Sequence, residues 1–454
     1  MCHHSVIVFL KIQLLLFLQL LPQWLGLDPQ VASRPDWDLE HWTPVSVLSY
    51  GADPKFDMCK LNFESYSVGG PNKLPMFKDL LAASKCTGRN SKVMRFSEIK
   101  EEMKNEEARG LPRSTMLSPT GFVFHESRVG STLVANLLGS DPFNMVFSES
   151  APPASVLLCG GCSHQEKVSL FRDTVLAMGR SPTHKRVFFK FQSITTQHMK
   201  IALEAFPETP WVFIYRNPVQ TMMSHLAPSS GASAKGAKCV SQSKHSQNKK
   251  ILDAFERAGT SSFHAPIEAM CAAHLNMLCE NAVDAYEAFG HFNNDPVRQR
   301  GLLLDYKFLP GAVPNLLLEH FGQPPASAQL LKSMAKESSQ YSKSSSRNLR
   351  RGKSGTFNGD SEDKEKRATD AIDEWANKIL GPTYEKMTSL SLPVIRSLSG
   401  GSTDYVELKL IHVAGGESVP VKQEGSVVLP SYAYEPFRNS HNSSRYEVSS
   451  CFLL

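Results

Sequence analysis

The sequence predicts an α/β fold in which helices cover both faces of a central parallel sheet, and two patterns lead to this prediction. From about residue 119, short apolar runs alternate with longer segments of helical periodicity. The apolar runs lack the polar alternation of a half-exposed strand, as expected for a sheet that is buried on both sides. The expected strands are Gly121–His125, Val187–Phe191, Trp211–Tyr215 and Gly301–Tyr306; the expected helices include Thr132–Leu138, Gln165–Met178, Thr196–Phe206 and Pro266–Phe289.

The chain has 454 residues, enough for one large domain with attached segments. The expected parts are a signal peptide or signal anchor (1–33), an extension (34–118), the main domain (119–390) with a flexible insertion (229–250), and a tail without an assigned fold (391–454). The insertion is predicted from its Ser, Ala, Gly and Lys content. In the extension, Phe96–Arg109 is of helical type. At the end of the main domain, Asp370–Met387 is expected to be a helix broken at Gly381-Pro382.

The N-terminus carries an apolar segment, Ser5–Leu21, which is interrupted by Lys11 and two glutamines. Its length falls between that of a signal-peptide core and that of a membrane-spanning helix. Two interpretations stay open: cleavage near Val31-Ala32-Ser33, which gives a secreted protein, or an uncleaved anchor with the rest of the chain in the Golgi lumen. A buried N-terminal helix is a third alternative. We expect the chain to enter the secretory pathway, where a tail sequon at Asn442 would make it a glycoprotein.

Charge and cysteine content restrict the class of partner. The formal net charge of +5 is small for this length and does not indicate a nucleic-acid partner. The nine cysteines fit an oxidising compartment. Cys59 and Cys86 are candidates for a disulfide, whereas Cys159-Gly-Gly-Cys162 looks like half of a metal or redox motif without its second half. A pair between Cys162 and Cys271 or Cys279 is also open, and no metal site is expected.

The first motif that carries chemistry is Arg128-Val129-Gly130-Ser131-Thr132, between an expected strand and an expected helix. Gly130 lets the backbone approach an anion closely, and the helix start supplies unpaired N–H groups and a positive dipole end. Ser131 and Thr132 add hydroxyl donors, and Arg128 adds a charged, planar donor group. The motif therefore predicts a phosphate or sulfate site; the alternative is a glycine turn that leads into a core helix.

The second motif follows where the strand Trp211–Tyr215 ends in Arg216-Asn217-Pro218, and its arginine lies 88 positions after Arg128. Ser224 follows the arginine by eight residues, two turns into the next expected helix, so that both side chains can converge on one anion. A solvent-facing arginine at an ordinary strand-to-helix turn is the alternative interpretation.

Together and in this order, the two motifs resemble the donor-binding elements of the sulfotransferase family, and the first is most similar to that of Golgi carbohydrate sulfotransferases. The resemblance covers roughly residues 119–390 and implies a P-loop NTPase-like three-layer sandwich. It also implies the donor 3′-phosphoadenosine 5′-phosphosulfate, with the first motif at its 5′ side and Arg216 and Ser224 at its 3′-phosphate. Arg351-Gly352-Lys353 resembles the family's later loop over the 3′-phosphate and adenine; a solvated basic loop is the alternative.

Sulfuryl transfer also needs a group that takes the proton of the acceptor hydroxyl. Where family members carry a Lys-x-His base, this chain has Lys190-Phe191-Gln192, and Gln192 cannot act as a base. Glu149 resembles the strand-end glutamate of bacterial and carbohydrate sulfotransferases and is the favoured base. His125 and Glu126 are second choices. Lys190 is expected to stabilise the leaving phosphate or the transferring sulfuryl group, or else to be a surface lysine.

The sequence thus predicts a sulfotransferase that acts on a hydroxyl acceptor, carbohydrate or other. A second hypothesis is another P-loop enzyme such as a kinase, but Gly130 is followed by Ser131, not by the lysine of an NTP-binding loop. A third is a non-catalytic protein that keeps the fold and binds a nucleotide or a sulfated partner.

Overall fold

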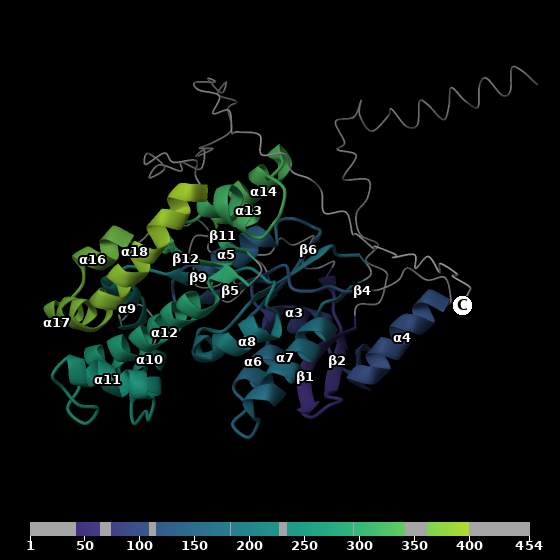
Figure 1. Ribbon diagram of the computed structural model, residues 1–454, viewed down its shortest axis with the longest axis horizontal. Helices are drawn as coiled ribbons and strands as arrows, with labels where there is room; N and C mark the ends of the chain where they lie inside the picture. The colour runs from purple at the N-terminus through teal and green to yellow at the C-terminus, as the bar shows by residue number, and fades with distance from the viewer. Residues whose placement is uncertain are drawn as a thin grey trace, which may run out of the picture. The chain divides into compact units, whose positions relative to one another are not determined.

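A computed structural model describes residues 42–63, 74–108, 115–181, 183–226, 234–293, 295–340 and 361–398 (Figure 1). Residues 5–21, residues 351–353 and the tail beyond residue 398, which carried several predictions, lie outside these ranges. Among the helices that the structure describes, none combines the length and apolarity needed to cross a membrane.

The centre of the fold is a five-stranded parallel sheet in the order β12-β9-β5-β8-β6. Its strands are β5 (Gly121–His125), β6 (Asn144–Ser148), β8 (Arg186–Lys190), β9 (Trp211–Tyr215) and β12 (Gly301–Asp305). Except for Arg186, every residue in them is buried. The predicted α/β fold with a parallel sheet is confirmed, and β6 is a strand that the sequence reading did not assign.

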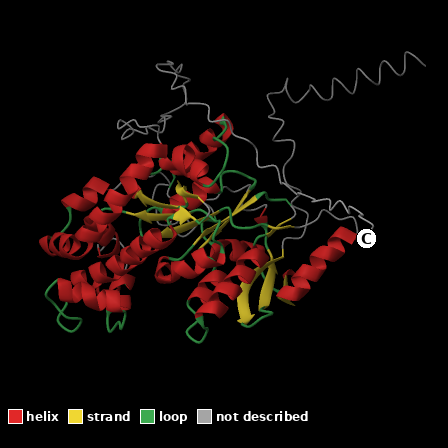
Figure 2. Ribbon diagram, in the orientation of Figure 1, coloured by secondary structure: helices red, strands yellow, loops and turns green. Residues whose placement is uncertain are grey.

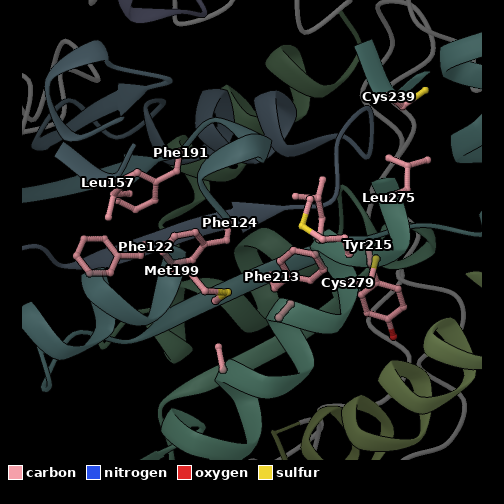
Figure 3. Packing of buried hydrophobic residues seen from close by; sticks show 14 of the residues in the cluster. Phe122, Phe124, Leu157, Phe191, Met199, Phe213, Tyr215, Cys239, Leu275 and Cys279 are labelled. Carbon is pink, nitrogen blue, oxygen red and sulfur yellow. The ribbon is translucent and has the colours of Figure 1, made fainter. Parts of the chain in front are cut away.

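Helices cover both faces of this sheet (Figure 2), and successive strand residues point to opposite sides. On one face, Phe122 and Phe124 pack with Phe171 of α7 and Leu275 of α12 in the largest hydrophobic cluster, part of which Figure 3 shows. On the other face, Val123 and its counterparts in β9 and β12 pack against α5 and α14. The molecule is therefore a three-layer sandwich, as predicted.

Helices and smaller strands surround the central sheet along the whole described chain. The strands outside the central sheet are β1 (Trp42–Ser49), β2 (Lys55–Lys60), β3 (Ser91–Arg95), β4 (Thr115–Met116), β7 (Arg180–Ser181), β10 (His291–Phe292) and β11 (Asp295–Gln299). The α-helices are α3 (Phe77–Ser84), α4 (Phe96–Ala108), α5 (Ser131–Leu138), α6 (Ala151–Leu157), α7 (His164–Met178), α8 (Met199–Ala205), α9 (Pro218–Leu226), α10 (Lys238–Ser243), α11 (Lys249–Arg257), α12 (Ile267–Phe289), α13 (Leu318–His320), α14 (Ala328–Ser338), α16 (Ser361–Lys366), α17 (Asp370–Trp375) and α18 (Gly381–Leu398). Short 3-10 turns are η3 (Gly88–Asn90), η4 (Ser193–His198), η6 (Ala234–Gly236) and η7 (Tyr306–Phe308), and π-helical segments are η8 (Val313–Leu317) and η9 (Ala376–Leu380).

The extension before residue 119 contains the antiparallel sheet β1-β2-β3 and the helix α4, which was predicted from its charge pattern. Cys59 in β2 forms the expected disulfide with Cys86. Cys59, Phe63 and Phe77 belong to the same hydrophobic cluster as Phe147 of β6. The extension therefore packs directly on the core of the main domain.

The flexible insertion predicted over residues 229–250 is wrong for its described part, residues 234–250. This part forms α10 and the start of α11, and Cys239 in α10 is fully buried in a disulfide with Cys271 of α12. The Ser, Ala, Gly and Lys content of this segment was misleading as a predictor of flexibility. A few buried apolar residues, among them Val240 and Ile251, together with the disulfide are enough to hold these short helices on the core.

Two further predictions need correction. Cys162 pairs with Cys159, not with a cysteine of α12, and Cys279 is a buried free thiol. The closing helix is not broken at Gly381-Pro382: the chain widens into the π-helix η9 and continues as α18 to Leu398. We attribute this to the wider π turn, which makes room for the ring of Pro382 one turn downstream.

Candidate functional site

Each strand of the central sheet ends on a charged residue or is followed directly by one. Glu149 follows β6, Lys190 ends β8, Glu126 follows β5, Arg216 follows β9 and Asp305 ends β12. Because parallel strands present their carboxyl ends at one edge, these groups share one edge of the sheet. After β5, the chain forms β6 and β8 on one side of β5 in the sheet. It then crosses to the other side of β5, where it forms β9 and β12. The loops after β5 and β9 therefore flank the topological switch point, where open α/β sheets bind ligands.

The loop after β5 presents a run of uncommitted backbone donors. Ser127, Arg128 and Gly130 have φ angles of 129°, 59° and 78°, and α5 begins at Ser131. Within the described residues, none of the N–H groups of residues 127–133 donates a hydrogen bond. A regular helix start leaves only about four such groups. Consecutive N–H groups in a turn that leads into a helix form a concave anion-binding site.

Side chains of the same loop add donors to this site. Arg128 is exposed; its Nε donates to the backbone oxygen of Ser224 at 3.3 Å, and it forms no ion pair with any described residue. The hydroxyls of Ser131 and Thr132, whose residues are 4% exposed, make no hydrogen bond within the described ranges. The loop thus combines positive charge with free donors, which suits a phosphate or sulfate group.

Gly130 is required at this position for two reasons. Its φ angle of 78° lies in the left-handed region, and a Cβ atom here would lie 2.7 Å from Cε2 of Tyr306. Tyr306 follows β12, so the loop after a third strand closes over the first motif. A side chain at residue 130 would displace this ring.

The same tyrosine covers the arginine of the second motif. The Arg216 guanidinium carbon lies 4.1 Å from the centre of the Tyr306 ring, a cation–π distance, and Arg216 is 4% exposed. Its Nε donates to Oε1 of Gln220 at 2.7 Å, and Nε2 of Gln220 donates to Oε1 of Glu365 in α16 at 2.6 Å. Arg216 is therefore fixed in place by stacking and by a hydrogen bond.

Glu126 lies behind this arginine and is 1% exposed. Its Oε2 accepts a hydrogen bond from the backbone N–H of Arg216 at 3.3 Å, and the N–H of Glu126 donates to the Ile214 carbonyl at 3.0 Å. Burial raises the pKa of Glu126 to about 8; the nearby charge of Asp305 acts in the same direction, whereas Arg216 and its N–H act against it. Glu126 thus binds the two loops together as a buried group and does not face solvent.

The two motifs predicted from the sequence lie side by side. Besides the contact from Arg128 to the Ser224 carbonyl, the Ser224 hydroxyl donates to the Gln220 carbonyl at 2.8 Å. Gln220 in turn holds Arg216. Residues 96 positions apart in the chain are thereby joined into one cluster at the switch point.

Glu149 and Lys190 form a second cluster on the neighbouring strands. Lys190 is 1% exposed and its Nζ contacts Oε1 of Glu149, which is 26% exposed. Glu149 has a φ angle of 56°, and its N–H donates to the Lys190 carbonyl at 2.6 Å. The favoured base and the expected charge stabiliser thus contact each other at the sheet edge, with the carboxylate the more accessible of the two.

His125 differs from the other candidates because its ring faces the interior. It is 4% exposed, and its Nε2 lies 3.0 Å from the carbonyl oxygen of Phe191. A proton acceptor must reach the acceptor hydroxyl, and this burial does not favour His125 in that role.

The sequence reading missed Tyr306 and Gln220. Tyr306 stands at the end of the expected strand Gly301–Tyr306, where side chains reach the site, and Gln220 lies four residues after Arg216, one helical turn away. Both residues could therefore have been predicted as site residues from their distance in sequence to the strand end and to Arg216. Arg351, Gly352 and Lys353 lie outside the described residues. Within the residues that the structure describes, no group of three or more His, Cys, Asp or Glu side chains could hold a metal ion.

Comparisons with known proteins give distant structural similarities alone. No family model matches the chain, and no curated protein matches it. Among solved structures, it is similar to the sulfotransferase domain of the olefin synthase of Synechococcus PCC 7002, with 12% identity, coverage of 58% of this chain and 94% of that domain, and a TM-score of 0.32. It is also similar to a sulfotransferase of Mycobacterium avium, with 13% identity, coverage of 57% of this chain and 74% of that chain, and a TM-score of 0.31. A sulfotransferase of Alicyclobacillus acidocaldarius shows 11% identity, coverage of 48% of this chain and 91% of that chain, and a TM-score of 0.28.

Identities and TM-scores of this size carry no argument about fold or activity. The assignment of an α/β sandwich rests on the chain's own five-stranded parallel sheet and on the helices on its two faces.

Proposed function

We propose that this chain is a sulfotransferase, which transfers a sulfuryl group from 3′-phosphoadenosine 5′-phosphosulfate to a hydroxyl group, that of a carbohydrate in the first instance. One observation carries the proposal: the uncommitted N–H groups of residues 127–133 and the unpaired charge of Arg128 lie next to Arg216 and Ser224. A donor with anionic groups at both ends needs two such sites side by side.

The residues present fit this donor. Gly130 keeps the first loop free of a side chain, so that the backbone can approach a 5′-phosphosulfate, and Ser131 and Thr132 supply hydroxyl donors. Arg216 and Ser224 would bind the 3′-phosphate. Tyr306 and Gln220 hold the Arg216 guanidinium in one orientation, which reduces the conformational entropy that binding must remove.

The bound donor supplies a sulfuryl group attached to a good leaving group, a phosphate oxygen. Glu149 would take the proton of the acceptor hydroxyl as the bond between that oxygen and sulfur forms and the bond between sulfur and the phosphate oxygen of the donor breaks. The buried ammonium of Lys190 orients this carboxylate and adds positive charge near the transferring group. Arg128 and the N–H groups of the first loop bind the negative charge that remains on the phosphate.

A kinase or another NTP-dependent enzyme is the second candidate, but the first loop supplies no lysine for the β- and γ-phosphates. The expected location in the secretory pathway and a membrane attachment through residues 5–21 complete the proposal. Their test is the cleavage state and topology of the N-terminus in a secretory cell.

Calorimetry tests the donor site. The full chain is titrated with adenosine 3′,5′-bisphosphate and with ATP, and Arg128→Gln is compared with Arg89→Gln, a matched control on an exposed arginine in η3 of the extension. We expect preference for the bisphosphate, an affinity loss of about tenfold in Arg128→Gln, and none in Arg89→Gln. Preference for ATP, or equal behaviour of the two variants, would contradict the proposal.

Sulfuryl transfer to a panel of sugar and other hydroxyl acceptors tests the activity. Glu149→Gln should lower kcat by about 100-fold or more without changing bisphosphate affinity. Bisphosphate binding without transfer to any acceptor would favour the non-catalytic alternative.

A further inference from the structure

Among the three disulfides of the described chain, Cys159–Cys162 is the one in which both cysteines are partly exposed; Cys86 of the disulfide with Cys59 is partly exposed as well, but Cys59 is not. The disulfide Cys159–Cys162 lies in the turn between α6 and α7, where Gly160 and Gly161 are exposed. Cys239 and Cys271 are fully buried, and so is Cys59 of the third disulfide. A reductant in solution therefore has better access to Cys159–Cys162 than to the other two disulfides, each of which has at least one fully buried cysteine.

Loop length is a second difference. Cys159 and Cys162 are separated by 3 positions, whereas the other two disulfides join residues 27 and 32 positions apart. The restriction that a disulfide places on the unfolded chain grows with the length of the closed loop. The short bridge therefore restricts the unfolded chain least, and we expect the fold to stay intact when it opens.

The surroundings favour a negatively charged sulfur at Cys162. It lies two residues before His164, the first residue of the 15-residue helix α7, whose N-terminal end is positive. Nζ of Lys167 donates to the carbonyl of Leu157 at 3.4 Å, which places an ammonium at the end of α6, two residues before Cys159. The Glu166 carboxylate at the same helix start is hydrogen-bonded to the N–H of Ser163 in a capping box. A thiolate that leaves from Cys162 is stabilised by the dipole and the ammonium.

We propose that Cys159–Cys162 is a dithiol–disulfide exchange site that reacts with external dithiols, a property separate from sulfuryl transfer. Cys162 packs against the main hydrophobic cluster, so we assign Cys159 as the sulfur that is attacked. The thiolate of the external dithiol forms a bond to Sγ of Cys159, and the Cys159–Cys162 bond breaks to leave the Cys162 thiolate. The second external thiol then displaces Cys159, giving an oxidised external disulfide and two protein thiols, a transfer of two electrons and two protons.

Selective reduction tests this proposal. The full chain is incubated with increasing dithiothreitol, thiols are alkylated, and each cysteine is followed by peptide mass spectrometry. We expect Cys159 and Cys162 to be alkylated at concentrations of dithiothreitol at least about tenfold lower than Cys59, Cys86, Cys239 and Cys271. The buried free thiol of Cys279 reports unfolding, and it should stay unmodified throughout this range.

Three variants make the test decisive. Lys167→Gln should slow the reduction of Cys159–Cys162 severalfold, whereas Lys332→Gln, on an exposed lysine of α14, should not. Cys159→Ser/Cys162→Ser should keep the melting temperature within about 2 °C. Opening of all three disulfides together, or a large drop in melting temperature in the double variant, would show a structural bridge and overturn the proposal.

Discussion

The loop after β5 and the loop after β9 meet at one edge of the sheet, but they differ in how much of their hydrogen-bonding capacity is already used. In the first loop, the N–H groups of residues 127–133 and the charge of exposed Arg128 have no acidic or backbone acceptor within the described chain, apart from one contact of Arg128 to the Ser224 carbonyl. In the second, Arg216 is buried, stacked on Tyr306 and bonded to Gln220.

This difference separates two tasks at one site. In the proposed site, the free donors of the first loop bind an anion at little cost to the fold, because nothing in the folded chain has to be released first. Arg216, which is buried and fixed, would orient the ligand, and its removal would disturb the packing beneath it. Changes in the first loop should therefore affect mainly binding, and changes in the second should affect binding and stability together. Gly130 is the exception in the first loop because Tyr306 packs on it.

The largest effect is expected for Gly130→Ala. The φ angle of 78° and the approach of a Cβ to 2.7 Å of Tyr306 should lower the free energy of unfolding by about 2–4 kcal/mol and abolish measurable bisphosphate binding. Urea unfolding and calorimetry measure the two effects. Gly259→Ala is the matched control: its φ angle is 66° and no atom lies within 4 Å of the added Cβ, so only the backbone strain of about 1 kcal/mol remains. Equal losses in the two variants would show that the contact with Tyr306 is unimportant.

Arg216→Ala should have the next largest effect and should separate the two loops. We expect losses of about 2 kcal/mol in bisphosphate binding and about 2–3 kcal/mol in the free energy of unfolding, because both the anion contact and the packing on Tyr306 are lost. The same measurements on Arg128→Gln should show weaker binding at unchanged stability. A destabilised Arg128→Gln, or a fully stable Arg216→Ala, would contradict the division of tasks.

Glu126, at the start of the first loop, accepts a hydrogen bond from the second loop and gives the stability of the folded chain a pH dependence. Its pKa is raised from 4.5 to about 8 in the folded state, so the folded state holds a proton that the unfolded state has released. Stability from this group is therefore complete below about pH 4.5 and is lost as the pH rises to about 8. Between pH 6.5 and 8, the free energy of unfolding should fall less steeply with pH in Glu126→Gln than in the native chain. The two slopes should differ by up to about 1.4 kcal/mol per pH unit.

This pH window lies above the range in which the half-buried His225 and the buried His274 titrate, because desolvation lowers their pKa values to about 3 and about 4. The stability that these neutral histidines contribute to the folded state is lost only as the pH falls below about 6.5. Urea unfolding across the window measures the slope, with Glu319→Gln, on an exposed glutamate of α13, as control. Parallel curves for the native chain and Glu126→Gln would refute the assigned protonation.

Ser224→Ala should give the smallest effect. Its hydroxyl donates to the carbonyl of Gln220 within α9, so the fold does not depend on it, and stability should change by less than about 0.5 kcal/mol. Loss of one hydrogen bond to the 3′-phosphate should weaken bisphosphate binding by about 1 kcal/mol. Binding of adenosine 5′-phosphate, which has no 3′-phosphate, should be unchanged; a loss there would place Ser224 elsewhere in the site.

The sequence by itself determined the layered α/β fold and the two loops. Uninterrupted apolar runs such as Phe122–Phe124 and Val212–Ile214 can be buried on both faces only in a covered parallel sheet. Strand-to-helix transitions at Gly130 and Arg216 are local features, readable from spacing. The strand β6 was not predicted because Asn144–Ser148 has polar residues at both ends and an apolar run of only three residues between them.

Only the tertiary structure decided which residues meet. The stacking of Tyr306 on Arg216, the contact of Glu149 with Lys190 and the burial of Glu126 join strands that are distant in the chain, and a register of parallel strands cannot be read from local pattern. The disulfide Cys239–Cys271 likewise converted a segment of loop-like composition into packed helices. Local propensity thus set the elements and the loops, while long-range packing set the partners, the burial and hence the charge state of the site.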